Sequence, residues 1–330
     1  MTHTRPSVRP SPTRPSGRPI LLAFAFACGL VGCGDDPAPG EEGGACNSNG
    51  SCSTPLLCWT GICVDRADVD VEWREVSIGY HRSCALSRDG AVLCWSNWAA
   101  SPLDAPTFVQ ISAGWDHICG LTETASVVCW GDDSHGQSSP PDGTFQGVSA
   151  GSSHTCGLAT DGTIACWGNE AEGQGTPPAG EFVQVSTGSF HACALAADGS
   201  PTCWGSDLYG QATPPAGPFV QVSAGGYHTC ALTTDGTITC WGFDEDGQAS
   251  PPGGAFAQVS GGSEHNCAIA ADGSVACWGL DDHGQSTPPA GEFTDISAGF
   301  EHSCGVRADH TLACWGANRD NQTSPPHSGT

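Results

Sequence analysis

Cysteine and histidine recur at fixed spacing, and they are the residue types in this sequence that could do chemistry. Fourteen of the 20 Cys form seven Cys-x9-Cys-Trp units. The pairs are Cys84 and Cys94, Cys119 and Cys129, Cys156 and Cys166, Cys193 and Cys203, Cys230 and Cys240, Cys267 and Cys277, and Cys304 and Cys314. Six His stand two residues before a unit, at His117, His154, His191, His228, His265 and His302. Paired thiols form disulfides or bind metals, and imidazoles bind metals, act as bases or serve as hydrogen-bonded pegs.

The cysteine unit is part of a longer repeat that occurs seven times and reads F-V-Q-V-S-A-G-x-x-H-x-C-A-L-x-x-D-G-x-x-x-C-W-G-x-x-x-x-G-Q. Its leading aromatic residue falls at Trp73, Phe108, Phe145, Phe182, Phe219, Phe256 and Phe293, with spacings of 35 and then 37 residues. A unit of this length supplies about four short strands, which is one propeller blade. The outer copies keep apolar residues that an open solenoid would need to cap. We therefore predict an all-β, seven-bladed β-propeller over residues 73–326.

The third copy shows how the cysteines lie within a blade. Alternating apolar residues flank residues 160–162, which predicts a hairpin whose turn is closed by Gly162 in the left-handed region. Counting outward from this turn, Cys156 faces Cys166 at a non-hydrogen-bonded pair, within reach of a disulfide. We predict one such disulfide in each blade. A metal site is the alternative, which is disfavoured because no second pair stands at ligand spacing.

The same alternation predicts how neighbouring hairpins pack. Cys156 and Leu158 share one face, while Trp167 shares the other with the small residues Gly157 and Ala165. We expect the tryptophan face of one hairpin to lie against the cysteine and leucine face of the next.

The repeat resembles that of the regulator of chromosome condensation family, through A-G-x-x-H-x-x-A-L-x-x-D-G-x-x-x-x-W-G-x-x-x-x-G-Q. The resemblance implies a seven-bladed propeller and, for the family's best-known activity, guanine-nucleotide exchange on a nuclear GTPase. The first copy departs from the pattern, because Arg82 replaces His and residues 96–100 replace Gly-Gln. The cysteine pairs replace ordinary strand residues, which suits an exported relative. An exported chain does not meet a nuclear GTPase, so we do not expect the exchange activity.

Residues 1–32 have the pattern of an export signal. Four Arg and no acid precede an apolar run over residues 20–31, which is too short to span a bilayer and is followed closely by Cys33. This segment resembles the bacterial lipoprotein signal, which implies lipidation of Cys33 and a membrane anchor. Gly34 after it favours the outer membrane of a Gram-negative cell. A plain signal peptide is the alternative.

Three short segments separate the anchor from the propeller. Residues 33–45 hold Cys33 and an acidic Gly/Pro tether that has nothing to bury. Residues 46–64 contain Cys46, Cys52, Cys58 and Cys63, which predicts a small two-disulfide module whose pairing stays open. Residues 65–72 are a linker.

Composition excludes several function classes. The chain has no Lys and a net charge of −25, so it would repel nucleic acids and anionic lipid. It lacks the G-x-S-x-G, H-E-x-x-H and phosphate-loop motifs. We therefore expect no enzyme activity, no catalytic residues, no cofactor and no metal, and a monomer whose membrane contact is the lipid anchor alone. The recurring His are interpreted as structural pegs, and the acids before Gly-Gln as structural turns, with calcium binding as the alternative.

The two residues between Gly and His vary most from copy to copy and mark the candidate site. In a closed ring these loops would gather on one face that mixes aromatics and acids, as protein and glycan contact surfaces do. The candidates are Tyr80, Trp115, Asp116, Phe190, Tyr227, Glu264, Phe300 and Glu301. We thus expect a non-enzymatic cell-envelope lipoprotein that binds a protein or glycan in the envelope or outside the cell. The alternatives are an inhibitor of an exported enzyme and a glycan-acting surface enzyme.

Overall fold

The computed structural model describes residues 57–59, 62–64, 71–96 and 106–325, and these parts contain strands but no helix. Strands β1 (Leu57–Trp59) and β2 (Ile62–Val64) pair antiparallel, with Cys58 opposite Cys63. The predicted signal segment, Cys33 and the tether lie outside the described residues, as does most of the cysteine module. Within the described parts, no helix is long and apolar enough to cross a membrane.

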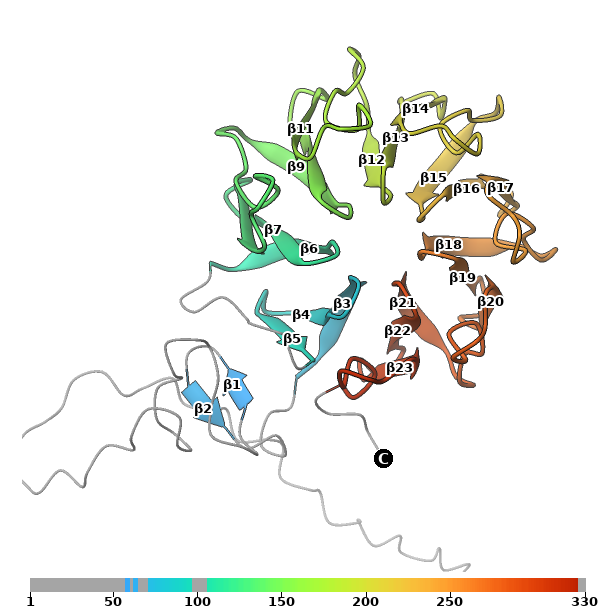
Figure 1. The fold of residues 1–330 in the computed structure, drawn as a ribbon. Coiled ribbons are helices and arrows are strands. Elements are labelled where there is room, and N and C mark those ends of the chain that lie inside the picture. The colour runs from blue at the N-terminus through green and yellow to red at the C-terminus, as the bar shows by residue number, and fades with distance from the viewer. Residues whose placement is uncertain (1–56, 60–61, 65–70, 97–105, 326–330) are drawn as a thin grey trace, which may run out of the picture. The chain divides into compact units, whose positions relative to one another are not determined.

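Seven antiparallel sheets follow one another around a central axis (Figure 1). Blades 1 to 3 are β3 (Trp73–Ile78), β4 (Ser83–Ser87) and β5 (Val92–Trp95); β6 (Phe108–Ala113), β7 (His117–Thr122) and β8 (Val127–Gly131); and β9 (Phe145–Ala150), β10 (His154–Ala159) and β11 (Ile164–Gly168). Blades 4 and 5 are β12 (Gln184–Thr187), β13 (His191–Leu195) and β14 (Pro201–Gly205); and β15 (Phe219–Ala224), β16 (His228–Thr233) and β17 (Ile238–Gly242). Blades 6 and 7 are β18 (Phe256–Gly261), β19 (His265–Ala270) and β20 (Val275–Gly279); and β21 (Phe293–Ala298), β22 (His302–Arg307) and β23 (Leu312–Gly316).

Each blade has three strands, so the expectation of about four strands per unit was wrong. In blades 2 to 7, the residues after Trp-Gly fold into a polar turn instead of a fourth strand. In blade 2, Asp133 Oδ1 accepts a hydrogen bond from Ser138 N at 2.8 Å and closes this turn. Two prolines, at 140 and 141, come next and cannot donate to a strand ladder. The turn therefore takes the place of the outermost strand.

The predicted hairpins and their disulfides are confirmed. In blade 3, Gly162 has a φ of +86°, and the register sets Cys156 opposite Cys166. All seven predicted cysteine pairs are bonded, with Cα atoms 4.0 to 4.1 Å apart. In chain order, the disulfides join Cys84 to Cys94, Cys119 to Cys129, Cys156 to Cys166, Cys193 to Cys203, Cys230 to Cys240, Cys267 to Cys277, and Cys304 to Cys314. Disulfides persist in oxidising compartments, so seven of them indicate an oxidising, extracellular environment.

The two cysteines of a pair differ in burial, although they share one bond. The first member, on the middle strand of the blade, is fully buried in every case. The second member lies on the outer strand and is partly exposed in six blades, at Cys129, Cys166, Cys203, Cys240, Cys277 and Cys314, while Cys94 of blade 1 is buried. Each disulfide therefore ties the outer strand of its blade to a strand in the core.

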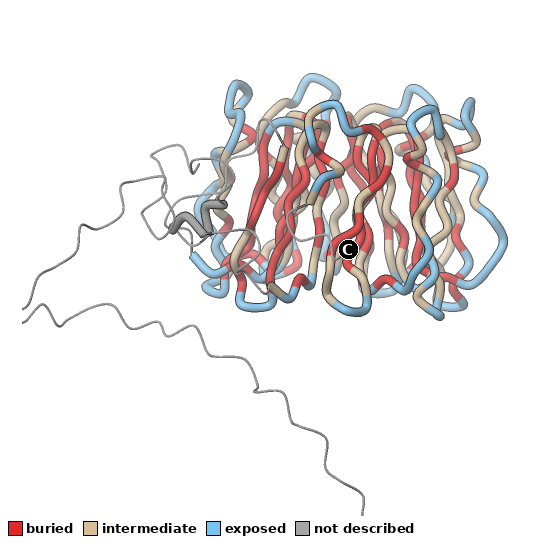
Figure 2. Tube along the Cα trace, turned by 90° about the horizontal axis from the view of Figure 1, so that it is seen from below, coloured by how far each residue is buried: buried red, intermediate tan, exposed pale blue. Residues whose placement is uncertain are grey.

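The core consists of side chains that fill the spaces between blades. Cys119 and Leu121 of blade 2 pack against Phe145, Val148 and Trp167 of blade 3, which confirms the predicted nesting of hairpin faces. Figure 2 shows the buried residues along the strands and the exposed residues at the loops of both ends.

Five of the six recurring histidines link their blade to the next, which agrees with their interpretation as structural pegs. His117 Nε2 lies 2.7 Å from Thr155 Oγ1 of the following blade, and both side chains are buried. Equivalent contacts of 2.8 Å join His191 to Thr229, His228 to Asn266 and His265 to Ser303. His302 of blade 7 contacts Ser83 of blade 1 at 2.9 Å, which closes the ring.

The glutamine of the Gly-Gln motif contributes hydrogen bonds to the same interface between neighbouring blades, which we call the seam. The backbone oxygen of Gln137 accepts hydrogen bonds from Trp167 Nε1 at 2.9 Å and from Thr155 Oγ1 at 3.0 Å in the next blade. The oxygen of Gln322 does the same for Trp95 and Ser83 across the closure of the ring, at 2.9 Å each. One carbonyl thus satisfies two buried donors of the neighbouring blade.

Two carboxyl groups replace glutamine amides on the inner strands. Gln110 Oε1 accepts a hydrogen bond from Val148 N of the next blade at 3.1 Å. In blades 1 and 7 the acceptors are Glu75, bonded to Ile111 N at 2.9 Å, and Asp295, bonded to Val76 N at 2.8 Å. Burial raises the pKa of Glu75 to about 8 and that of Asp295 to about 6.

Two of the seven links between blades lack this histidine bond, because blade 1 has Arg82 in place of His and His154 of blade 3 has no partner. His154 is fully buried, yet neither of its ring nitrogens has a hydrogen-bond partner. The position that carries Thr155 in blade 3 and Thr229 in blade 5 is Ala192 in blade 4, which offers no polar group. An unsatisfied buried polar group costs about 1–3 kcal/mol.

We expect Ala192→Thr to raise the free energy of unfolding by about 1 kcal/mol, because its hydroxyl can bond both His154 and the Gln174 carbonyl. Urea denaturation measures the change. Ala192→Val has nearly the same shape without the hydroxyl and controls for packing and strand propensity. Equal stabilities of the Thr and Val variants would contradict this account.

We also expect the protein to lose stability as the pH falls below about 6.5. Burial lowers the pKa of the six recurring His from 6.5 to about 3 or 4, so the unfolded chain binds their protons first. Each of these His lowers the free energy of unfolding by up to about 1.4 kcal/mol for each unit by which the pH falls. Glu75 and Asp295 act in the opposite direction because their pKa values are raised, but six groups outweigh two. The measurement is unfolding free energy at pH 7 and pH 5. His154→Leu should reduce the slope, and an unchanged slope would contradict the assignment.

Candidate functional site

The predicted site loops meet around a central cavity of about 90 Å³. Each loop follows the first, innermost strand of its blade, and a glycine makes the close approach possible. A Cβ added at Gly114 would lie 2.2 Å from the carbonyl oxygen of Gly151 in the next blade. Only a residue without a side chain fits at such a contact.

The structure divides each variable residue pair into an inner and an outer member. The inner members line the mouth of the cavity and are Tyr80, Trp115, Ser152, Ser189, Gly226, Ser263 and Phe300. Of the predicted site residues, only Tyr80, Trp115 and Phe300 belong to this inner ring. The outer members, which include Phe190, Tyr227, Glu264 and Glu301, instead make their contacts with a second variable stretch, the four residues between Trp-Gly and Gly-Gln.

The two variable stretches form one surface, which we call the loop face. The residue after Trp-Gly donates its backbone N–H to the carbonyl just before the recurring His, as in Phe243 N to Tyr227 O and Leu280 N to Glu264 O, both at 2.9 Å. The loop face comprises the residues between Gly and His and the four residues between Trp-Gly and Gly-Gln. The sequence had suggested two separate features.

A first aromatic cluster, the mouth cluster, spans blades 7, 1 and 2. The ring centroids of Tyr80 and Phe300 are 4.2 Å apart, and those of Tyr80 and Trp115 are 5.2 Å apart. Trp115 and Phe300 are 6.3 Å apart. The three rings form one wall of the cavity mouth, opposite the small residues of blades 3 to 6.

A second aromatic cluster, the side cluster, lies between blades 4 and 5. The ring centroids of Phe190 and Tyr227 are 5.5 Å apart, and Tyr209 lies 5.6 Å from Tyr227 and 4.8 Å from Phe243. Leu208 beside Tyr209 is 76% exposed. Sequence reasoning missed Tyr209 and Phe243. Their only signal was aromatic character in a stretch that is otherwise polar.

Carboxylates separate the two clusters on blades 5 to 7. Burial raises the pKa of Glu264, and the negative charges of Asp246, Glu301 and Asp282 raise it further. Glu264 also contributes to the raised pKa of Tyr227, after burial and Tyr209. The acids are therefore contiguous with the side cluster. Asp116 is an exposed acid on blade 2, beside Trp115 of the mouth cluster.

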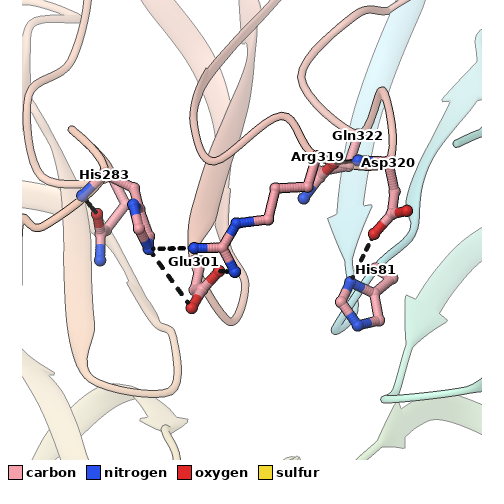
Figure 3. A network of polar contacts seen from close by, with 7 residues as sticks. His81, His283, Glu301, Arg319, Asp320 and Gln322 are labelled. Carbon is pink, nitrogen blue, oxygen red and sulfur yellow. Dashed lines mark hydrogen bonds and ion pairs between the residues drawn. The ribbon is translucent and has the colours of Figure 1, made fainter.

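A polar network crosses blades 6, 7 and 1 on this face (Figure 3). Glu301 lies 3.4 Å from Arg319 Nη1 and 3.6 Å from His283 Nε2, and Arg319 Nη2 lies 3.1 Å from the same imidazole nitrogen. His81 Nδ1 lies 3.2 Å from Asp320. Exposed ion pairs contribute little stability, so the effect of this network is to orient Glu301.

The turn acids before Gly-Gln are occupied by their own turns. Asp207, Asp244 and Asp281 each accept a hydrogen bond from the backbone N–H five residues later, at 2.7 to 2.8 Å. These bonds agree with the structural interpretation of the acids. In the parts of the chain that are described, no group of three or more His, Cys, Asp or Glu is placed to hold a metal ion.

The six recurring His, which could have formed a catalytic or metal-binding ring, are fully buried within the seams. A substrate cannot reach them. The loop face offers aromatic rings, carboxylates and hydroxyls to solvent, together with the imidazoles of His81 and His283 and the guanidinium of Arg319.

Comparison with known proteins identifies the repeat. The family model of the regulator of chromosome condensation (RCC1) repeat matches residues 108–137, 145–174, 182–211, 219–248, 256–285 and 293–322. Blade 1 lies outside these matches, in line with its Arg82 and its missing Gly-Gln. The search of curated protein sequences found no match.

Solved structures show the same fold. The CRINKLY WD40 ectodomain of the Arabidopsis thaliana receptor kinase ACR4 is 27% identical, with a TM-score of 0.62 over 73% of this chain and 96% of that one. The ectodomain of the Physcomitrella patens receptor kinase CR4 is 24% identical, with a TM-score of 0.65 over 74% of each chain. Saccharomyces cerevisiae Prp20p, described with its binding to Gsp1p and histones, is 16% identical, with a TM-score of 0.60 over 71% and 83%.

Six matched repeats, a seventh blade with the same disulfide and a ring closed between His302 and Ser83 lead to one conclusion: this chain belongs to the RCC1 repeat family and forms a seven-bladed β-propeller.

Proposed function

We propose that this protein is a non-enzymatic binding protein of the cell envelope, anchored by a lipid at Cys33, and that its loop face binds a protein partner. The observation that carries the proposal is that the repeated residues and the variable residues lie in different parts of the propeller. The recurring His, Trp and Gln form hydrogen bonds between neighbouring blades, whereas variable residues form two aromatic clusters on one face.

A protein fits this face better than a small molecule. Small-molecule sites are usually cavities of roughly 300–1,000 Å³, and the central cavity measures about 90 Å³. Exposed Tyr and Leu around a rigid scaffold are typical of protein contact surfaces. Glycan binding is the alternative outcome of the experiment below.

An extracellular location supports this proposal and disfavours nucleotide exchange. Seven disulfides are not maintained in a reducing cytosol. The 27% identical ACR4 structure is itself an ectodomain. The likeness to Prp20p, at 16% identity, extends to the fold alone and brings no GTPase partner to this chain.

The binding face is tested by capture from an envelope fraction with purified protein as bait. Combined Trp115→Ala, Phe190→Ala, Tyr227→Ala and Phe300→Ala substitutions should reduce capture of the partner at least about tenfold, because aromatic anchors carry most of an interface's energy. The matched control changes Val109, Val183 and Val220 to Ala, which are exposed residues at the opposite end of the inner strands. Both variants must unfold at the wild-type temperature. Equal capture by both would discard the loop face as the site, and glycan capture would identify the other partner class.

The anchor is tested separately by cell fractionation. We expect the wild-type protein in the membrane fraction and Cys33→Ser in the soluble envelope fraction, because acyl chains on this residue would hold the protein at the bilayer. Mass spectrometry of the N-terminal peptide identifies the modification. A wild-type protein that is soluble and begins at another residue would contradict the lipid anchor.

A further inference from the structure

The mouth of the central cavity is asymmetric in shape. Its inner ring presents three contiguous aromatic rings from blades 7, 1 and 2, while blades 3 to 6 contribute Ser152, Ser189, Gly226 and Ser263. The small residues leave an opening in front of an aromatic wall. With about 90 Å³ of space, this opening has room for about one side chain.

The rim of the same opening is asymmetric in charge. Glu264 directly follows Ser263 and Glu301 directly follows Phe300, so both acids lie one residue outward from the cavity lining. Glu301 is already engaged by Arg319 and His283. Within the described chain, the carboxylate of Glu264 has no hydrogen-bond donor and is surrounded by the charges of Asp246, Asp282 and Glu301.

A partly buried carboxylate among three other acids carries unfavourable electrostatic energy that an arriving cation would offset. Aromatic faces attract the same kind of group, because guanidinium and ammonium ions bind the negative face of the ring. Arginine satisfies both features, since its stem and planar head stack on aromatics while its N–H groups bond carboxylates. The aromatic wall and the carboxylates at the rim therefore both favour an arginine side chain.

We infer that the partner is a protein with a protruding basic segment, which inserts an arginine side chain into the cavity mouth between the aromatic wall and Glu264. The remaining basic residues of the segment lie over Asp246 and Asp282, toward the side cluster. This inference rests on the proposed binding function and specifies the partner class for the same face. Charge complementarity also accelerates the encounter of such a segment with this acidic protein.

The test uses a short fluorescein-labelled peptide of alternating Gly and Arg, with its citrulline counterpart as an uncharged probe of the same shape. Fluorescence anisotropy at physiological ionic strength should show binding of the Arg peptide and at least about tenfold weaker binding of the citrulline peptide. Glu264→Gln and Trp115→Ala should each weaken binding of the Arg peptide about five- to tenfold. The matched control is Asp272→Asn, which removes one charge from a hairpin turn at the opposite end of blade 6.

The outcomes separate this inference from the proposed function. Equal effects of Glu264→Gln and Asp272→Asn would mean diffuse attraction by net charge and would overturn the inference. Equal binding of both peptides would overturn it as well. If the partner captured from the envelope is lost by the aromatic variants but binds Glu264→Gln normally, the binding function stands and the arginine assignment falls. If the aromatic variants retain the partner, the loop face itself is wrong.

Discussion

The hydrogen bonds that cross each seam are the constraint on which the ring depends. Between blades 2 and 3, the backbone oxygen of Gln137 receives Trp167 and Thr155, and Thr155 also meets His117. These groups are buried, so each donor left without an acceptor would cost stability. The cost is visible at one seam, where His154 has no partner because Ala192 stands in place of a hydroxyl residue. The same constraint explains why these residue types recur along the chain.

The proposed function depends on the variable loop residues, which do not belong to the seams. The seam positions repeat with few exceptions, such as Arg82 and Ala192, whereas the loops at the cavity mouth differ between blades. They differ in an organised manner, with aromatics on blades 7, 1 and 2 and again on blades 4 and 5, and with acids between. A pseudo-symmetric scaffold thus carries an asymmetric face. Because disulfides and buried hydrogen bonds hold the scaffold, its loops lose little conformational freedom on binding.

Burial favours the neutral form of the titratable groups both in the seams and on the loop face. It lowers the pKa of the recurring His, which keeps them neutral pegs, and it raises the pKa of Glu75, which can then stand where other blades use a neutral Gln. On the loop face, burial and neighbouring acids raise the pKa of Glu264 without supplying a partner. The seam groups Trp167 and Thr155 are bonded within the chain, whereas the Glu264 carboxylate on the loop face has no hydrogen-bond donor among the described residues.

The repeat period, the hairpin register and the cysteine pairing were determined by the sequence alone, because turn chemistry and strand alternation act between residues close in the chain. Cys156 faces Cys166 for this local reason. Most of the candidate residues were chosen from the sequence because they vary within a regular repeat, and their role in binding stays a prediction. Tertiary structure decided three other matters. The segment after Trp-Gly became a turn, because its carboxylate bonds its own backbone. Tyr209 and Phe243 joined the site, and the variable pair divided into inner and outer members. The last two depend on how the blades are arranged about a common axis, which brings together loops that are distant in sequence.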